Sequence, residues 1–251
     1  MTLPTVWNEE LRIRYADGDY YRRWKLSGLF QTLQECATQH ALHLGRGYDQ
    51  LIKDDLAWVL SRFLLRIESL PLAGEQVKIE TWPKGLQQKL FFMRDFLITS
   101  PAGDKVYARA SSAWLIINTR TRRMQMPSVL GEGLPDNGGR FALDETLDRI
   151  PVNGIDLQEQ FTVQAHSSML DLMGHVTSAR YIEWMMDCFP VESYQSGVAW
   201  LQLNVNHEIK PGEHVSVASG KTADGSQVIQ GTNLDTSADA FTALMGFNRP
   251  A

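Results

Sequence analysis

The spacing of hydrophobic residues changes along the first half of this 251-residue chain, and it predicts a strand, a long helix and then further strands. Residues 9–17 show a short strand-like alternation, whereas residues 25–45 carry apolar side chains such as Leu29 and Leu33 at helical spacing and end on Gly45. After this helix the period becomes two, which is typical of strands. The strands are expected at 56–70, 75–85, 86–100 and 104–118, with turns at Pro71 and Gly74, at Pro83 and Gly85, and at 101–104.

The same order of elements returns in the second half of the chain. A passage rich in glycine, proline and aspartate, from about Pro127 to Gly154, interrupts the pattern, and we interpret it as a linker. Residues 159–168 then resemble a strand and residues 177–189 an amphipathic helix. Four more strands are expected at 198–208, 213–222, 226–235 and 239–249. Two similar units, about 140 to 150 residues apart, favour an α+β class in which each antiparallel sheet wraps around one helix.

Composition adds limits on partners and compartment. The chain is 43% hydrophobic and 21% charged, and its formal net charge of −5 gives no bulk attraction to nucleic acid or to an anionic membrane. The N-terminus lacks the pattern of a signal peptide, and no run of about 18 apolar residues predicts a membrane-spanning helix. Cys36 and Cys188 have neither metal nor redox spacing. We therefore expect a reducing, cytoplasmic compartment, no nucleic-acid partner and no membrane insertion.

Short motifs that suggest ligands fail on their spacing. The stretch SGKT lacks the first glycine of a phosphate-binding loop, because Val215 occupies that position. The stretch HEIKP, from His207 to Pro211, has proline where a zinc motif needs its second histidine. The stretch GEGLPD lacks the third glycine of a dinucleotide fingerprint. We expect neither a metal nor a cofactor.

One stretch, MLDLMGHVTSARYIEW from Met169 to Trp184, combines an acid, a glycine and a histidine just before the second helix. Thr177 or Ser178 is a suitable N-cap, so main-chain N–H groups near the start of the helix could face an anion. Gly174 permits close approach of the backbone. Taken alone, this stretch is more typical of an ordinary loop than of a catalytic turn.

Several linked segments change that balance. LFQTLQECATQHALHLG, DLAWVLSRFLLRIE, TWPKGLQQKLFFMRDF, ARASSAWLIINTRTRR and DLMGHVTSARYIEW occur in the order in which they resemble the acyl-acyl-carrier-protein thioesterases. The resemblance covers most of the chain and implies two tandem hot-dog units. It implies an N-terminal unit at 1–130 that holds the acyl chain, a linker at 131–154, and a C-terminal unit at 155–251 with the catalytic turn. Plant relatives carry a transit peptide, and its absence favours the bacterial branch.

The resemblance also implies an activity and a site. The activity is hydrolysis of an acyl thioester on acyl carrier protein, releasing a free fatty acid in fatty acid biosynthesis. Asp171 and His175 fall on the family's acid and histidine, and Glu208 falls on its glutamate. We expect Asp171 to orient the site, and His175 and Glu208 to bind and activate water. The backbone N–H near Gly174 would help to polarise the thioester carbonyl.

The turn departs from the family pattern Asp-x-Asn-x-His-Val-Asn-Asn. Met173 stands where the functional amide is expected, and Thr177 and Ser178 replace the last two asparagines. Asn206 could supply the amide, because on a strand it would share a face with Glu208. The alternative is a site closer to the single hot-dog acyl-CoA hydrolases, in which the acid does the main work.

The resemblance also bears on partners. Arg120, Arg122 and Arg123 form the densest basic cluster, which could dock an acidic carrier protein or could be a solvated strand end. Two rival functions stay open: an acyl-CoA thioesterase of the same fold, and a catalytically weak acyl-thioester-binding module. Oligomeric state is open as well, since a double unit could be self-sufficient or could form a homodimer.

Overall fold

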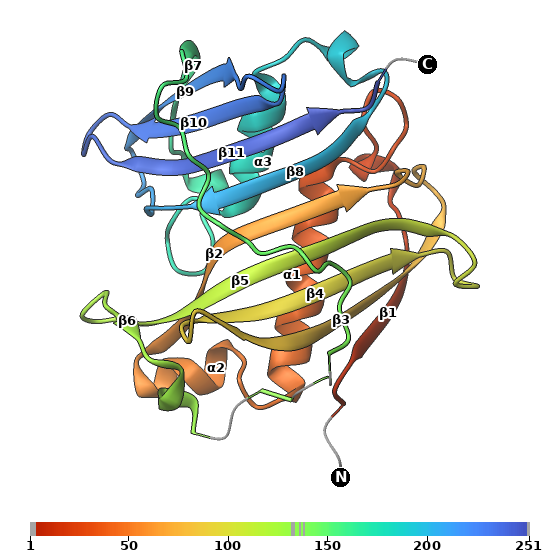
Figure 1. Cartoon of the computed structure of the whole chain (residues 1–251). Helices are drawn as coiled ribbons and strands as arrows, with labels where there is room; N and C mark the ends of the chain where they lie inside the picture. The colour runs from red at the N-terminus through yellow and green to blue at the C-terminus, as the bar shows by residue number, and fades with distance from the viewer. Residues whose placement is uncertain (1–3, 132–133, 136, 138, 250–251) are drawn as a thin grey trace. The chain divides into compact units, whose positions relative to one another are not determined.

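The computed structural model describes residues 4–131, 134–135, 137 and 139–249, and the chain divides into two compact units (Figure 1). The first unit comprises the chain up to Trp24 together with Leu29–Leu147. The second unit comprises Lys25–Gly28 and the chain from Asp148 onward. Each unit consists of an antiparallel sheet and one principal helix, so the predicted α+β class is confirmed.

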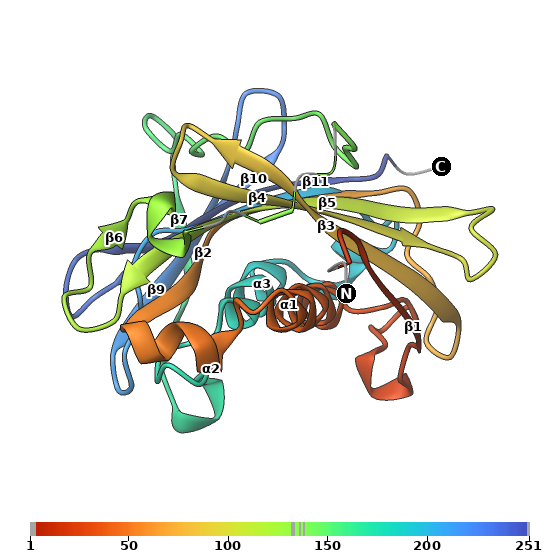
Figure 2. The same cartoon turned by 90° about the horizontal axis from the view of Figure 1, so that it is seen from below.

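The sheet of the first unit has the strand order β1-β3-β4-β5-β2, with the short strand β6 beside β5. Its helix α1 lies on the concave side of this sheet (Figure 2). Phe30 of α1 meets Phe63 of β2 edge to face, with ring centroids 4.8 Å apart. The elements are β1 (Trp7–Arg12), α1 (Leu26–His43), α2 (Tyr48–Leu51), β2 (Leu56–Ile67), β3 (Gln76–Gln87), β4 (Phe91–Thr99), β5 (Val106–Asn118) and β6 (Met124–Gln125), with short 3₁₀ turns at Tyr15–Asp17, Ile52–Asp54 and Pro127–Leu130.

The turn expected at Pro83 and Gly85 is wrong. Strand β3 runs through both residues to Gln87, and its pairing with β4 shifts register between Pro83 and Gly85. Proline is tolerated here because β1 pairs with β3 only as far as Thr81, so no strand on that side needs an N–H from position 83. A bulge absorbs the two turn-forming residues without ending the strand.

The passage interpreted as a linker contributes to the first unit. Residues 140–147 cross the face of the sheet opposite α1 (Figure 1), and Leu143 and Leu147 are buried in a cluster with side chains of the strands. The cluster consists of Leu64, Phe91, Met93, Ala113, Leu143 and Leu147. Residues 132–133, 136 and 138 of this passage lie outside the described part of the chain.

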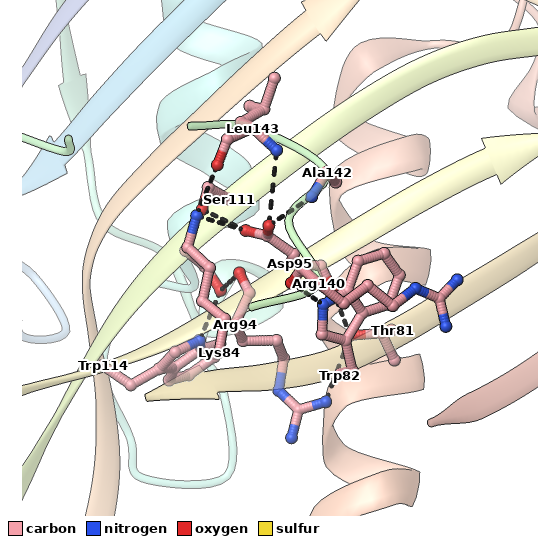
Figure 3. Close-up of polar contacts among 11 residues, drawn as sticks. Thr81, Trp82, Lys84, Arg94, Asp95, Ser111, Trp114, Arg140, Ala142 and Leu143 are labelled. Atoms are coloured by element: carbon pink, nitrogen blue, oxygen red, sulfur yellow. Dashed lines mark hydrogen bonds and ion pairs between the residues drawn. The ribbon is translucent and has the colours of Figure 1, made fainter. Parts of the chain in front are cut away.

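A buried ion pair fixes this segment to the sheet (Figure 3). The ammonium of Lys84 lies 2.9 Å from Asp95 Oδ1, with side chains 9% and 0% exposed, and Ser111 donates a hydroxyl hydrogen bond to the same oxygen. Asp95 Oδ2 accepts main-chain hydrogen bonds from Ala142, at 2.7 Å, and Leu143, at 3.4 Å. Lys84 in turn donates to the carbonyl of Leu143. One carboxylate therefore holds three strands, β3, β4 and β5, and the crossing segment together.

A second polar cluster faces α1. The guanidinium of Arg94 donates to His40 Nδ1 at 3.0 Å and to Thr81 Oγ1 at 3.2 Å, and all three residues are buried. Because an arginine can only donate, His40 Nδ1 must be the acceptor, and its Nε2–H donates to the carbonyl of Pro4. Burial lowers the pKa of His40 from its ordinary 6.5 to about 4 and that of Arg94 to about 10.

The second unit repeats the plan with the strand order β8-β11-β10-β9-β7 and helix α3. Tyr181 of α3 stacks on Phe241 of β11 at 4.8 Å between ring centroids, which places the helix against the sheet. The elements are β7 (Gln158–Gln164), α3 (Ser178–Asp187), β8 (Val198–Val205), β9 (His214–Lys221), β10 (Gln227–Asn233) and β11 (Asp239–Phe247), with 3₁₀ turns at Ser167–Met169 and Val191–Tyr194. Within the described residues, no helix is both long and apolar enough to cross a membrane.

Candidate active site

The acid–glycine–histidine stretch folds into a tight turn that its own aspartate closes. The main-chain N–H of Asp171 donates to the carbonyl of His175 at 2.8 Å, and Gly174 N donates to the carbonyl of Asp171 at 3.0 Å. The carboxylate Oδ1 of Asp171 accepts the N–H groups of Met173, at 2.8 Å, and His175, at 3.2 Å. Gly174 has φ +78°, a left-handed conformation that glycine adopts without steric cost. The sequence therefore places its acid and its glycine where this turn requires them.

Contacts between this turn and the segment after β8 place Glu208, the third candidate residue, next to the turn. Leu170 and Val176 form an isolated antiparallel bridge, and Val176 N donates to the carbonyl of Ile209 at 3.0 Å. Because Val176 and Ile209 are joined, the residues that precede them lie side by side. His175 Nε2 is 3.3 Å from Glu208 Oε2, and the side chains are 16% and 35% exposed. The structure thus brings Asp171, His175 and Glu208 into one site within the second unit.

Helix α3 begins directly after the turn. Thr177 is the N-cap and Ser178 the first helical residue, although the Thr177 side chain makes no capping hydrogen bond. Tyr181, on the buried face of the first turns, was not identified from the sequence. Burial raises its pKa well above the usual value, and the nearby charge of Asp171 acts in the same direction, so the phenol stays protonated. Its position could have been found from the helical spacing with Trp184 and Met185, which are also buried.

This arrangement can hold and deprotonate a water molecule. A carboxylate and an imidazole separated by 3.3 Å can share one proton, and imidazole exchanges protons in the neutral pH range. Both side chains keep some exposure, so solvent reaches them. Asp171 has one carboxylate oxygen committed to main-chain N–H groups, which suits it to positioning the turn.

Asn206 lies beyond the strand on which we expected it to share a face with Glu208. Strand β8 ends at Val205, so the two-residue period of a strand does not extend to Asn206 and Glu208. The main-chain N–H groups of Asn206 and His207 both donate to the carbonyl of Ala240.

The three arginines lie in the first unit, in the hairpin that joins β5 to β6. Arg120, Arg122 and Arg123 are all exposed, and Arg120 pairs with Asp55 at 2.7 Å. Met124 and Met126 follow them in sequence and are each 60% exposed, so the surface is apolar as well as basic. Within the described part of the chain, no group of three histidine, cysteine or carboxylate side chains is placed to hold a metal ion.

A helix wrapped by an antiparallel sheet, present twice in one chain, defines the class as a tandem hot-dog protein. An acyl-ACP thioesterase from Bacteroides thetaiotaomicron shares this structure, with a TM-score of 0.82 and 25% identity over 97% of this chain and 98% of that chain. The 12:0-ACP thioesterase from Umbellularia californica also has a TM-score of 0.82, with 21% identity and 98% of each chain covered.

Sequence comparison narrows the class to a family. Residues 4–130 match the acyl-ACP thioesterase N-terminal domain and residues 155–243 match the acyl-ACP thioesterase C-terminal domain. The chain belongs to the acyl-ACP thioesterase family, so the predicted resemblance is confirmed.

Among curated relatives, the oleoyl-acyl carrier protein thioesterase 1 of Arabidopsis thaliana is 30% identical over 64% of this chain and 48% of its own length. A palmitoyl-acyl carrier protein thioesterase of Gossypium hirsutum is 25% identical over 76% of this chain and 49% of its own length. Both relatives are chloroplastic, and this chain spans about half the length of the curated relatives it matches.

Proposed function

We propose that this protein hydrolyses acyl-acyl-carrier-protein thioesters and releases free fatty acids for lipid metabolism. The observation that carries the proposal is the 3.3 Å separation of His175 Nε2 and Glu208 Oε2 beside a turn closed by Asp171, in a chain of this family. The names of the relatives, which include thioesterases for 12:0, oleoyl and palmitoyl carrier substrates, support the substrate class.

The reaction requires a proton acceptor for water, donors for the oxyanion and a turn that is held in place. A water molecule beside the contacting His175–Glu208 pair gives up a proton as it attacks the thioester carbonyl, and the pair accepts that proton. The carbonyl oxygen becomes negative and is stabilised by main-chain N–H groups at the start of α3 rather than near Gly174, because Met173, Gly174 and His175 donate their N–H groups to Asp171. Collapse of the tetrahedral intermediate expels the thiolate, which needs no strong acid because a thiol pKa is about 8.5. Asp171 acts by holding the turn in place.

Two kinds of group are candidates to replace the family amide: the side chain of Asn206 and main-chain N–H groups. Met173 supplies its main-chain N–H to Asp171 but has no side-chain donor. Asn206 is two residues from Glu208 in sequence and half-buried, so we keep it as the candidate side-chain amide. If Asn206→Ala leaves kcat unchanged, main-chain donors alone stabilise the oxyanion.

The first unit supplies substrate binding in this proposal. We infer that it holds the acyl chain, as the family resemblance suggests. We infer that the exposed surface of Arg120, Arg122 and Arg123 docks the acidic carrier protein. The protein as a whole is acidic, so this basic surface is where an acidic partner would be attracted. Cys36 and Cys188 are free and buried, which supports the expectation of a reducing cytoplasm.

A hydrolysis assay tests this proposal. Acyl-carrier-protein and acyl-CoA substrates of 8 to 18 carbons (roughly the range of common fatty acids) are compared on the wild type, on Glu208→Gln, and on Glu192→Gln as an exposed control in the same unit. We expect kcat/KM to favour the carrier-linked substrates and Glu208→Gln to reduce kcat about 100-fold or more. Equal use of both carriers would instead favour an acyl-CoA thioesterase. Tight binding of acyl thioesters without turnover in the wild type would favour a binding module.

A further inference from the structure

The first unit contains a turn with the same main-chain hydrogen bonds as the active-site turn. Asp19 N donates to the carbonyl of Arg23 at 2.7 Å, and Arg22 N donates to the carbonyl of Asp19 at 2.9 Å. Arg23 N donates to the carboxylate Oδ1 of Asp19 at 2.8 Å. Gly18 and Trp24 form an isolated antiparallel bridge across the base of the turn. Helix α1 then begins at Leu26, two residues beyond the bridge.

These contacts match the second unit position by position. In both turns the aspartate N–H bonds to the carbonyl four residues later, and the aspartate Oδ1 accepts that residue's N–H. Arg23 thus stands where the other turn has His175. Arg22 has φ +64°, close to the +78° of Gly174 at the same place, although a left-handed conformation is uncommon for arginine. A 3₁₀ turn precedes each: Tyr15–Asp17 in one unit and Ser167–Met169 in the other.

The segment that carries the glutamate in the second unit also has a counterpart. Trp24 N donates to the carbonyl of Pro71 at 2.9 Å, as Val176 N does to Ile209 at 3.0 Å. The residue before each acceptor is therefore equivalent, and it is Leu70 in one unit and Glu208 in the other. Neighbouring bonds agree, because Glu68 and Ser69 both donate to Tyr107 O, as Asn206 and His207 both donate to Ala240 O.

The differences between the two turns that bear on proton transfer lie at the positions of His175 and Glu208. Arg23 Nε lies 3.2 Å from Asp19 Oδ2, and the ion pair is partly buried, with side chains 17% and 26% exposed. The guanidinium also lies 4.8 Å from the centre of the Tyr21 ring. A guanidinium has only N–H donors and no acceptor, so Arg23 cannot take a proton from water. Leu70 offers no carboxylate in place of Glu208.

We propose that the N-terminal turn is a second, catalytically silent copy of the active-site turn. In both copies the aspartate is a positioning residue that closes the backbone, and the residue four places later decides the chemistry. Histidine with a facing glutamate activates water, whereas arginine pairs with the aspartate and locks the turn. The silence of the first copy rests on the proposed function, because it is defined relative to hydrolysis at His175 and Glu208.

The first test compares the two aspartates. Asp19→Ala and Asp171→Ala are measured for Tm and for kcat on an acyl-carrier-protein substrate. Asp19→Ala should lower Tm by a few degrees and leave kcat within about twofold, since its turn has no reacting group. Asp171→Ala should lower kcat by about 100-fold or more. A large loss of kcat in Asp19→Ala with an unchanged Tm would overturn the proposal, because it would place the N-terminal turn in the reaction.

The second test transfers the silent residue into the active turn. His175→Arg should fold with a Tm at least as high as that of His175→Ala, because an arginine at this place can pair with the aspartate as it does in the first unit. If His175→Arg has a Tm many degrees below that of His175→Ala, the two turns are not equivalent and the proposal fails. This arm depends on folding alone. Absence of hydrolysis in the wild type would refute the proposed function without affecting the equivalence of the turns.

Discussion

Replacing Asp95 by asparagine should destabilise the first unit by about 3–5 kcal/mol, because it leaves a buried ammonium without its counter-charge. The carboxylate is fully buried and lies 2.9 Å from Lys84, which is itself 9% exposed. Its oxygens also accept hydrogen bonds from Ser111 and from the N–H groups of Ala142 and Leu143. An asparagine would turn an amide donor toward one of these donors, at a further cost of about 1–3 kcal/mol.

Urea denaturation at pH 7 measures this loss as a change in the free energy of unfolding. Asp144→Asn is the matched control, because Asp144 is exposed on the same crossing segment, and it should change stability by about 0.5 kcal/mol or less. Adding Lys84→Met to Asp95→Asn should restore part of the loss by removing the unpaired charge. A loss below about 1 kcal/mol in Asp95→Asn would refute the reasoning, since it would mean that the pair is solvated or exchangeable.

Three further predictions concern other parts of the chain. The folded-state pKa of His40, about 4, lies below its ordinary 6.5, so between these values the unfolded chain binds a proton that the folded protein does not. The free energy of unfolding is therefore highest above pH 6.5 and falls by roughly 3 kcal/mol as the pH drops toward 4. Denaturation curves of His40→Gln should lack this part of the pH dependence, and identical curves for variant and wild type would contradict it. Gly174→Ala should lower the free energy of unfolding by about 1–2 kcal/mol, because alanine is strained at a positive φ, and it should also lower kcat. Gly225→Ala, with φ +88° in a hairpin, should lower the free energy of unfolding but leave kcat unchanged. Reversing the charges of Arg120, Arg122 and Arg123 should lower kcat/KM and its salt dependence for carrier-linked substrates but not for CoA substrates; no change would exclude docking there.

Much of the fold was predictable because its signals are local. The helix of α1 shows an apolar period over many residues, and the buried positions Leu29, Phe30, Leu33, Cys36, Ala37 and His40 follow it. The strands show alternation, and most of their turns hold glycine or proline. The turn at Pro83 was wrong because tertiary pairing decides whether a proline ends a strand. Position 83 lies beyond the partner strand β1, and this cannot be deduced from the local sequence.

The polar interior was not predictable in the same way. Lys84 and Asp95 lie on neighbouring strands and Ala142 lies on the crossing segment, and the two charged residues are each typical of exposed positions. Their burial depends on residues 140–147 crossing the sheet, a segment whose composition indicates a linker. Charge pairs of this kind are visible only when the contacts are known.

The candidate site was predictable in part. Asp171, Gly174 and His175 form a recognisable turn before a helix, but their relation to Glu208 came from the family resemblance and not from spacing. The silent copy was missed because Asp19 and Arg23 carry no catalytic histidine. The two turns share a sequence pattern: an aspartate, an apolar residue five positions later, and the first helical residue seven positions later. The pattern runs from Asp19 to Leu26 in the first unit and from Asp171 to Ser178 in the second.

The most direct test of the central claim is a double-mutant cycle between His175 and Glu208, with kcat measured on an acyl-carrier-protein substrate. His175→Ala and Glu208→Gln should each lower kcat by about 100-fold or more. If the pair activates one water as a unit, the double variant should be no slower than the slower single variant by more than a few-fold. Multiplied losses in the double variant, or a single variant with wild-type kcat, would contradict the account.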